Sequence, residues 1–208
     1  MNPEKGALKI LDETGAVLTN GHFLYTSGKH GGVYINKDAV YPHTRLISKL
    51  CRMIAEHFSK QEIDGVVAPV VGGVILSQWV SHHLSELKGK EVLGIYAEKS
   101  MDGFLIQRGY DRLIPGKKIL IVEDILNTGG SVKKVVETVR GLNGNIVGVG
   151  ALVNRGGVTP EDLGNVPNLY ALVNLNFEAW DPKACPLCLK KIPINTEVGK
   201  GKKSAKAS

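Results

Sequence analysis

From residue 63 onward the chain alternates between two kinds of segment. Short apolar runs are typical of buried strands, and stretches with helical spacing separate several of them. The apolar runs cover residues 63–71, 91–97, 118–122, 146–153 and 169–175. Strands that alternate with helices predict a parallel sheet. We therefore expect an α/β fold with a mostly parallel central sheet flanked by helices.

The helical segments have apolar stripes that indicate which side faces the core. Helices are predicted over residues 44–59, 74–84 and 131–142. The expected inward face of the first comprises Leu46, Leu50, Met53, Ile54 and Phe58. That of the third comprises Val132, Val135, Val136 and Val139. Residues 99–115 are polar and rich in glycine, which predicts a loop or a flexible hairpin, and a short strand pair is expected within residues 21–36.

Composition places these elements in one domain of ordinary character. The chain has 208 residues, 43% of them hydrophobic, and no apolar run reaches the roughly 20 residues of a membrane helix. The N-terminus lacks the apolar stretch of a secretory signal. Three cysteines without such a signal favour a reducing cytoplasm.

The net charge of +6 is concentrated at the C-terminus. Residues 199–208 hold four lysines and no acid, so the rest of the chain carries only +2. We interpret residues 1–198 as a single domain and residues 199–208 as a disordered basic tail. No basic stripe is evident on the folded part, so neither nucleic acid nor membrane is expected as a partner.

The segment after the third apolar run carries the most specific chemistry. Glu123 and Asp124 follow that run, and the sequence then continues through Asn127, Thr128, Gly129, Gly130 and Ser131 into a helix. Glycines and the N–H groups at a helix start suit a phosphate, whereas two carboxylates suit sugar hydroxyls or a metal ion. A ligand with a phosphate and vicinal hydroxyls, such as ribose 5-phosphate, explains both halves. The alternative is an ordinary strand end followed by a turn.

This segment matches neither of two common phosphate-binding motifs. The P-loop pattern GxxxxGK[ST] does not occur, and no GxGxxG follows a strand. The run from Ile119 to Ser131 resembles the phosphoribosyl pyrophosphate (PRPP) signature of the type I phosphoribosyltransferases. The resemblance implies that Glu123 and Asp124 bind the ribose hydroxyls and that the loop 127–131 binds the 5-phosphate. It also implies a fold with a small hood, formed by about residues 1–40 and part of 176–198.

Three more segments resemble orotate phosphoribosyltransferases in particular. Residues 21–36 are similar to a hairpin that covers the base, in which Lys29 and His30 match basic positions near orotate and diphosphate. Gly72 and Gly73 match a loop on the diphosphate side. Taken alone, the first pair is better explained by an exposed turn, and the two glycines are equally consistent with a tight strand-to-helix turn.

The third segment, 97–110, matches the flexible catalytic loop that closes over the site. Lys99 matches the retained lysine, whereas Glu98 stands where an arginine is usual. Arg108 is similar to an arginine of a variant branch, although a solvated charge cluster explains it equally well. The resemblance implies that Lys99 and Arg108 stabilise the leaving diphosphate and that Asp124 orients the sugar.

The resemblance also implies partners and a cofactor. The substrates would be PRPP and orotate, with Mg²⁺ held mainly by substrate oxygens and no direct protein ligand. A cytoplasmic homodimer that shares the catalytic loop between subunits is expected. A salvage enzyme for a purine or another base, and a non-catalytic PRPP sensor, remain as alternatives.

Two further pairs of residues, one of cysteines and one of histidines, are potential metal ligands. Cys185 and Cys188 have zinc-knuckle spacing, but they supply only half of a closed four-ligand site. A metal shared with a distant histidine or across a dimer is an open alternative; the segment also resembles the C-terminus of the variant branch. Adjacent His82 and His83 face different sides of a helix, which makes them a poor chelate.

Overall fold

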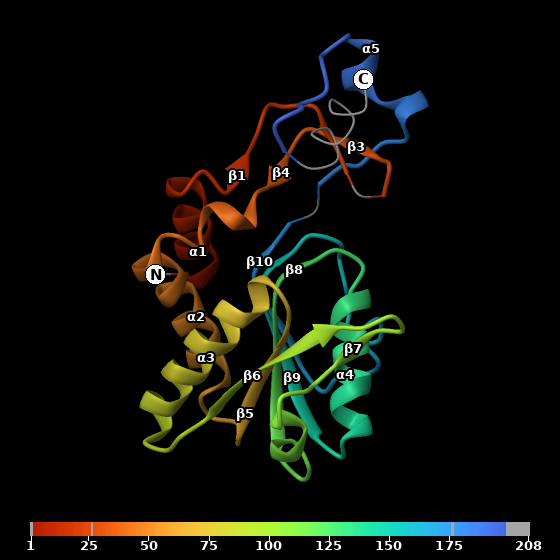
Figure 1. Cartoon of the computed structure of the whole chain (residues 1–208). Helices are drawn as coiled ribbons and strands as arrows, with labels where there is room; N and C mark the ends of the chain where they lie inside the picture. Colours follow the sequence, from red (N-terminus) through yellow and green to blue (C-terminus); the bar gives the residue numbers. More distant parts are fainter. Residues whose placement is uncertain (1, 26, 176, 199–208) are drawn as a thin grey trace. The chain divides into compact units, whose positions relative to one another are not determined.

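The computed structural model describes residues 2–25, 27–175 and 177–198 (Figure 1). The chain divides into two compact units. The first comprises Met1–Leu8 and His43–Leu175, and the second comprises Lys9–Pro42 and Asn176–Ser208. The second unit takes in most of the terminal segments that the sequence assigns to a hood, whereas residues 1–8 belong to the first unit. The role of these segments as a hood stays a prediction. The tail 199–208 lies outside the described residues.

A six-stranded sheet forms the centre of the first unit, in the order β10-β9-β8-β5-β6-β7. Its strands are β5 (Gly65–Pro69), β6 (Leu93–Lys99), β7 (Phe104–Leu105), β8 (Lys118–Leu126), β9 (Asn145–Asn154) and β10 (Leu169–Asn174). Neighbours from β10 to β6 pair in parallel, and only β7 is antiparallel to its partner. The mostly parallel α/β fold expected from the sequence is confirmed. The segment expected as a loop or hairpin contains β7 and a 3-10 turn, Tyr110–Leu113.

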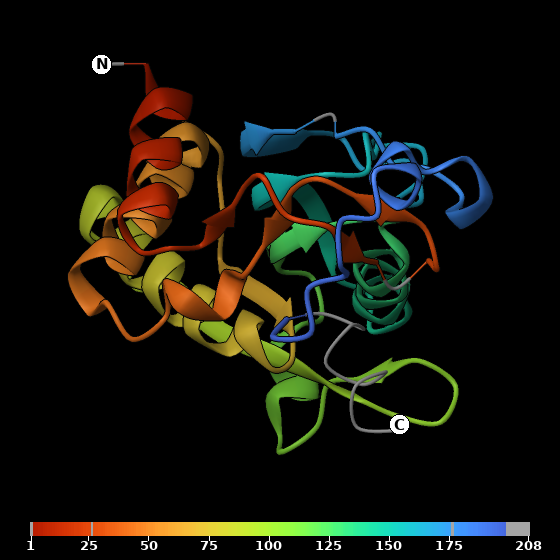
Figure 2. The ribbon, with the colours of Figure 1, turned by 90° about the horizontal axis from the view of Figure 1, so that it is seen from above.

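Helices cover both faces of this sheet. Figures 1 and 2 show α2 (Thr44–Phe58) and α3 (Gly72–Lys88) on one side and α4 (Gly130–Gly141) on the other. The sheet is therefore buried on both faces, which explains why its central strands are continuous apolar runs. Among the described residues, no helix combines the length and apolarity needed to cross a membrane.

The expected inward faces are largely correct. The four valines of α4 are all buried, as the spacing predicts. In α2, Ile47 and Cys51 are buried, whereas Leu46 and Met53 are only half-buried, so the stripe is rotated slightly from the expected one. Helix α2 lies close to β9, because a Cβ on Gly150 would lie 2.7 Å from Ile54.

The second unit contains short elements. The strand pairs are β1 (Val17–Leu18) with β4 (Tyr34–Ile35) and β2 (Phe23–Leu24) with β3 (His30–Gly31). A 3-10 turn at Lys37–Ala39, another at Pro182–Ala184 and the short helix α5 (Pro186–Leu189) complete it. Helix α1 (Pro3–Glu13) crosses the boundary between the units along the chain and was not expected. Its signals are Asn2, whose side chain accepts a hydrogen bond from Glu4 N–H, and the buried Ala7, Ile10 and Leu11.

Candidate active site

Two buried carboxylates lie near the carboxyl end of β8. The strand runs four residues beyond its expected end at Val122, because Ile125 and Leu126 continue the pairing with β9. Glu123 and Asp124 are therefore strand residues, with 9% and 4% of their surface exposed. Glu123 Oε1 accepts a hydrogen bond from Asp124 N–H at 3.0 Å, and Asp124 Oδ1 accepts one from Ile125 N–H at 2.7 Å. The backbone thus fixes the direction of both side chains.

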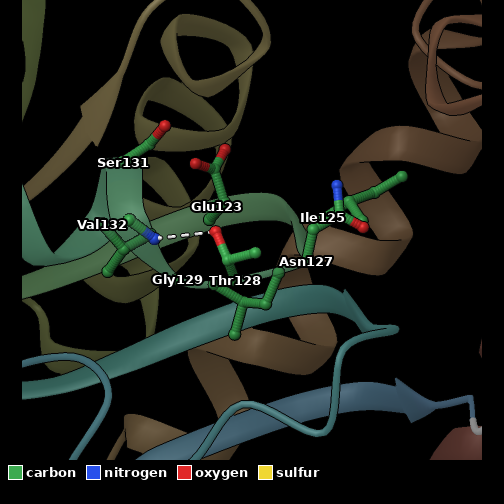
Figure 3. A pocket seen from close by; sticks show the side chains of 9 residues that line it. Glu123, Ile125, Asn127, Thr128, Gly129, Ser131 and Val132 are labelled. Carbon is green, nitrogen blue, oxygen red and sulfur yellow. Dashed lines mark hydrogen bonds between the residues drawn. The ribbon is translucent and has the colours of Figure 1, made fainter. Parts of the chain in front are cut away.

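A pocket of about 130 Å³ opens where β8 turns into α4. Its lining runs from Glu123 through the loop to Val132, but does not include Asp124. Figure 3 shows the Glu123 carboxylate and the Ser131 hydroxyl pointing the same way, with the Thr128 hydroxyl turned toward them. The exposed loop lies at the start of a 12-residue helix, where backbone N–H groups attract anions. The Glu123 carboxylate, which can accept hydrogen bonds, and a loop whose position suits an anion therefore share one small pocket.

Gly129 is required by the shape of this loop. Its φ of +73° lies in the left-handed region that side chains other than glycine adopt at a cost. A Cβ at this position would also lie 2.6 Å from Leu163 and 3.1 Å from Val158. Both the conformation and the close approach exclude a larger residue. Gly130, by contrast, has only an ordinary contact with Thr128 at 3.6 Å.

A second loop, which follows β9, supports the first. The Leu126 carbonyl accepts hydrogen bonds from Arg155 N–H at 2.9 Å and Gly156 N–H at 3.1 Å. The buried side chain of Asn154 accepts from Val158 N–H and donates to the Val158 carbonyl, at 3.0 and 2.9 Å. These contacts fix the shape of the supporting loop. This role of Asn154 cannot be predicted from the sequence, because the placement of its loop beside the first one depends on the pairing of β8 with β9.

A neighbouring pocket of about 410 Å³ brings two lysines to the same loop. It is lined by Lys99 and Lys134 together with Thr128, Gly130 and Ser131, and by residues of the β6–β7 hairpin. Lys99 was expected near the site. Lys134 was missed, although it stands three residues after Ser131 and thus on the same face of α4. Two cations beside an anion-binding loop suit a ligand with more than one phosphate.

Comparison with known proteins decides the family. The phosphoribosyl transferase domain family matches residues 36–183. The chain belongs to the phosphoribosyltransferase family. The matched region contains Lys99, the acidic pair and the whole loop 127–131, so the geometry above describes the PRPP-signature segment of a phosphoribosyltransferase.

Relatives of this phosphoribosyltransferase are named for the orotate reaction. The orotate phosphoribosyltransferase of Desulforamulus reducens is 37% identical over 193 residues, which cover 93% of this chain and 95% of the relative. That of Caldicellulosiruptor saccharolyticus is 38% identical over 195 residues, with 93% and 95% covered. The crystal structure of the enzyme from Aeropyrum pernix has a TM-score of 0.65 at 22% identity and covers 80% of this chain and 92% of its own. At this identity, the similarity to the Aeropyrum pernix structure shows a shared fold and no more.

The catalytic-loop segment of this phosphoribosyltransferase pairs the two residues that depart from the usual pattern. Arg108 Nε donates a hydrogen bond to Glu98 Oε1 at 2.5 Å, and Glu98 lies opposite Leu105 in the β6–β7 hairpin. That hydrogen bond, with the charge of Glu98, raises the pKa of Arg108 above its ordinary value. Among the described residues that line the two pockets, Lys99 is present and Arg108 is not. A role of Arg108 toward the leaving group stays a prediction.

The predicted diphosphate-side glycines lie at the start of α3. Gly73 has a packing reason to be glycine, because a Cβ there would lie 2.7 Å from Ala68 Cβ. Strands β5 and β8 are parallel neighbours, so the helices that follow them, α3 and α4, start at the same edge of the sheet. In open α/β sheets this edge is where ligands bind. Binding of diphosphate by Gly72 and Gly73 stays a prediction.

Lys29 and His30, the predicted basic pair of the N-terminal hairpin, belong to the second unit and differ in burial. Lys29 is exposed in the turn, with its carbonyl accepting from Tyr25 N–H at 2.8 Å. The His30 ring is buried, and its Nδ1 lies 2.8 Å from Nε2 of His22. Burial, with the nearby His22, lowers the pKa of His30. The His30 ring therefore lies inside this unit, whereas Lys29 is exposed; binding of orotate or diphosphate by either residue stays a prediction.

Proposed function

We propose that this protein transfers the 5-phosphoribosyl group from PRPP to orotate, giving orotidine 5-phosphate and diphosphate. The observation that carries the proposal is one small pocket that combines the Glu123 carboxylate with the phosphate loop 127–131. A ribose 5-phosphate group has hydroxyls that can bind the carboxylate and a phosphate that can bind the loop. The orotate phosphoribosyltransferases that resemble most of the chain support orotate as the acceptor.

The reaction requires stabilisation of two separating charges. Displacement at the anomeric carbon passes through a cationic sugar while negative charge grows on the departing diphosphate. Glu123 and Asp124 accept hydrogen bonds from the ribose hydroxyls and hold the sugar in line with orotate N1. Lys99, Lys134 and, after loop closure, Arg108 neutralise the phosphates, and Gly72 and Gly73 offer backbone N–H groups. Lys29 is the proposed contact on the base side.

Mg²⁺ is the proposed cofactor. When bound to diphosphate oxygens, it neutralises part of the charge on the leaving group. Two carboxylates near the pocket, Glu123 and Asp124, fit a hard cation held mainly by substrate oxygens. The proposed role of these two carboxylates is nevertheless to accept hydrogen bonds from the ribose hydroxyls.

The proposed enzyme is a cytoplasmic homodimer whose catalytic loop acts on the neighbouring subunit. Within one chain, Lys99 already lies beside the phosphate loop, so the sharing of this loop needs a direct test. Mixing Lys99→Ala and Asp124→Asn subunits provides it. Shared loops would restore activity in mixed dimers, because one site would then have both residues intact. If mixing restores nothing, each loop serves its own chain.

A base-panel assay tests the acceptor. The purified chain is incubated with PRPP, Mg²⁺ and one of orotate, adenine, guanine, hypoxanthine or uracil, and nucleotide formation is measured. We expect turnover with orotate and at least 100-fold lower kcat/KM for every other base. Turnover with a purine only would establish the salvage alternative. PRPP binding without turnover of any base would establish the sensor alternative.

A further inference from the structure

Four side chains from opposite ends of the sequence converge in the second unit. They are His22, His30, Cys185 and Cys188, and one nitrogen or sulfur atom of each lies within 4.8 Å of all the others. Three of the four residues are buried, and Cys188 is half-buried. The two histidines flank a hairpin, whereas the cysteines are more than 150 residues further along the chain. Nothing in the proposed transfer reaction uses this cluster.

The distances between these atoms are close to those of a tetrahedral metal site. His22 Nε2 lies 3.7 Å from the Sγ of Cys185 and 3.7 Å from that of Cys188, and His30 Nδ1 lies 3.3 Å from Cys188 Sγ. Around zinc, a sulfur and a nitrogen ligand are roughly 3.5 Å apart and two nitrogens roughly 3.3 Å apart, given bond lengths of about 2.3 and 2.0 Å. The two ring nitrogens, His22 Nε2 and His30 Nδ1, are nearer to each other, at 2.8 Å, so binding a metal requires them to move apart by roughly 0.5 Å.

The hydrogen bonding of His22 prepares it to be a ligand. Its Nδ1 lies 2.7 Å from the carbonyl oxygen of Ile192 and must carry the proton to donate there. The lone pair of the neutral ring is then on Nε2, the atom that faces the cysteines. A ligating histidine typically donates its other N–H to a carbonyl or carboxylate in this way. The tautomer that a metal requires is therefore fixed by the backbone.

The backbone places the four residues independently of their side chains. His22 and His30 lie on one face of the β2–β3 hairpin, because His30 pairs with Leu24 and side chains alternate. His30 also exchanges two backbone hydrogen bonds with Trp180, at 2.8 and 2.9 Å, and the His22 carbonyl accepts from Asn195 N–H at 2.7 Å. Cys185 begins the turn of α5, which returns the chain so that Cys188 faces the same point.

We propose that His22, His30, Cys185 and Cys188 form a structural zinc site that joins the N-terminal hairpin to the C-terminal segment. Two thiolates and two neutral imidazoles balance the charge of Zn²⁺, which suits a buried site. Four protein ligands leave no open position for water or substrate, so the site is structural rather than catalytic.

This unit has a physical need for a cross-link. Its strand pairs have two residues per strand, and isolated two-stranded pairs are marginally stable in water. Small units of this kind commonly rely on a metal or disulfides. A metal bound only in the folded state adds its binding free energy to folding. The zinc would therefore stabilise the hairpin that carries Lys29.

Another histidine cluster provides a useful contrast. His82, His83 and Glu86 also come close together, but they lie on one helix and two of the three are exposed. His83 is within hydrogen-bonding distance of both Ser48 and Glu86. These contacts account for that cluster without a metal, so His82 serves below as a control.

Metal analysis of the full chain tests the proposal. Protein expressed with zinc and purified under reducing conditions is analysed by mass spectrometry of the metal after gel filtration. We expect about one zinc per chain, loss of at least 80% of it in Cys185→Ser and Cys188→Ser, and full retention in the controls Cys51→Ala and His82→Ala. A zinc content below 0.2 per chain, or full retention in both serine variants, would overturn the site.

Two measurements on the unmodified sequence cover the case in which the serine variants fail to fold. Reconstitution with Co²⁺ should give the intense visible bands of a tetrahedral thiolate site; a weak octahedral spectrum contradicts the proposal. Cysteine alkylation should modify Cys185 and Cys188 at least tenfold faster after a chelator is added. Equal rates with and without the chelator, or a disulfide between Cys185 and Cys188 in protein purified under reducing conditions, would refute it.

Discussion

Arg108 and Glu98 form an ion pair on the β6–β7 hairpin, with Nε and Oε1 2.5 Å apart. Related catalytic loops are expected to have an arginine at the position of Glu98. In this chain, that position therefore binds the side chain of Arg108 instead of providing an arginine of its own. Both side chains are partly exposed, at 62% and 27%, and such surface pairs are easily exchanged for another partner. The pair is consistent with a loop that keeps Arg108 beside Glu98 until diphosphate replaces the carboxylate.

The first prediction concerns the replacement of Glu98 by diphosphate as the partner of Arg108. Arg108→Ala should lower kcat for orotate turnover roughly 100-fold, the typical loss for one group that stabilises developing charge. Glu98→Gln should lower the KM for PRPP a few-fold, because the competing anion is gone. Steady-state kinetics measures both, with Arg112→Ala as a control for an exposed arginine nearby. Unchanged kinetics in both variants would leave the ion pair with a structural role only.

The second prediction concerns the acidic pair. Asp124→Asn and Glu123→Gln should each reduce kcat/KM for PRPP about 10- to 100-fold, because a hydrogen bond to a charged group contributes about 1.5–3 kcal/mol. Circular dichroism and Tm should change little, since the amides retain the shape. Wild-type kinetics in both variants would contradict a role of these carboxylates in ribose binding.

The third prediction concerns the conformation of the phosphate loop. Gly129→Ala should destabilise the fold by roughly 2–4 kcal/mol, through the left-handed φ and the contact with Leu163. Urea unfolding measures this change, and Gly130→Ala is the matched control without either problem. In the background of Leu163→Ala, the cost of Gly129→Ala should fall but not vanish, because the conformational part remains. An equal cost in both backgrounds would exclude the steric contribution.

The fourth prediction distinguishes two adjacent lysines of α4. Lys134 lines the pocket beside the phosphate loop, whereas Lys133 lies about 100° further around the helix. Lys134→Ala should raise the KM for PRPP roughly 3- to 10-fold, and more steeply at low salt, where charges are less screened. Lys133→Ala should have less than a twofold effect. Equal effects would indicate a general contribution of charge rather than a contact.

The fifth prediction is a pH dependence of stability. Asp64 Oδ2 accepts a hydrogen bond from Lys118 N–H at 3.0 Å, and this bond is the main reason why the pKa of Asp64 lies below its ordinary 3.8. A lowered folded-state pKa stabilises the fold above pH 3.8, and the stabilisation is lost as the pH falls through the folded-state value.

Asp64→Asn tests this dependence. At pH 7 the variant should be about 1 kcal/mol less stable, because a neutral acceptor replaces a charged one, and the difference should shrink toward pH 3. Denaturant unfolding across this range measures it, with the exposed Asp102→Asn as control. A difference that stays constant with pH would show that the charge of Asp64 is not responsible.

The sequence alone predicted the parallel strands of the sheet and the contiguous loop of the candidate site. Parallel strands buried on both faces leave long apolar runs, and α4 shows its inward valines at helical spacing, so both are visible in local patterns. The loop from Glu123 to Ser131 is contiguous and its residue types follow from its chemistry. The longest element missed was α1, whose apolar side is short and whose first turn contains proline and glycine.

Tertiary structure decided everything that depends on residues distant in sequence. The support of the loop by Asn154 depends on the pairing of β8 with β9. The meeting of His22 and His30 with Cys185 and Cys188 depends on contacts between the two ends of the chain. A CxxC motif by itself shows only two ligands, and no spacing rule connects it to a histidine 163 residues away. Local patterns therefore determined the strands and the phosphate loop, whereas folding alone brought the four ligands together, because their proximity is set by long-range backbone pairing.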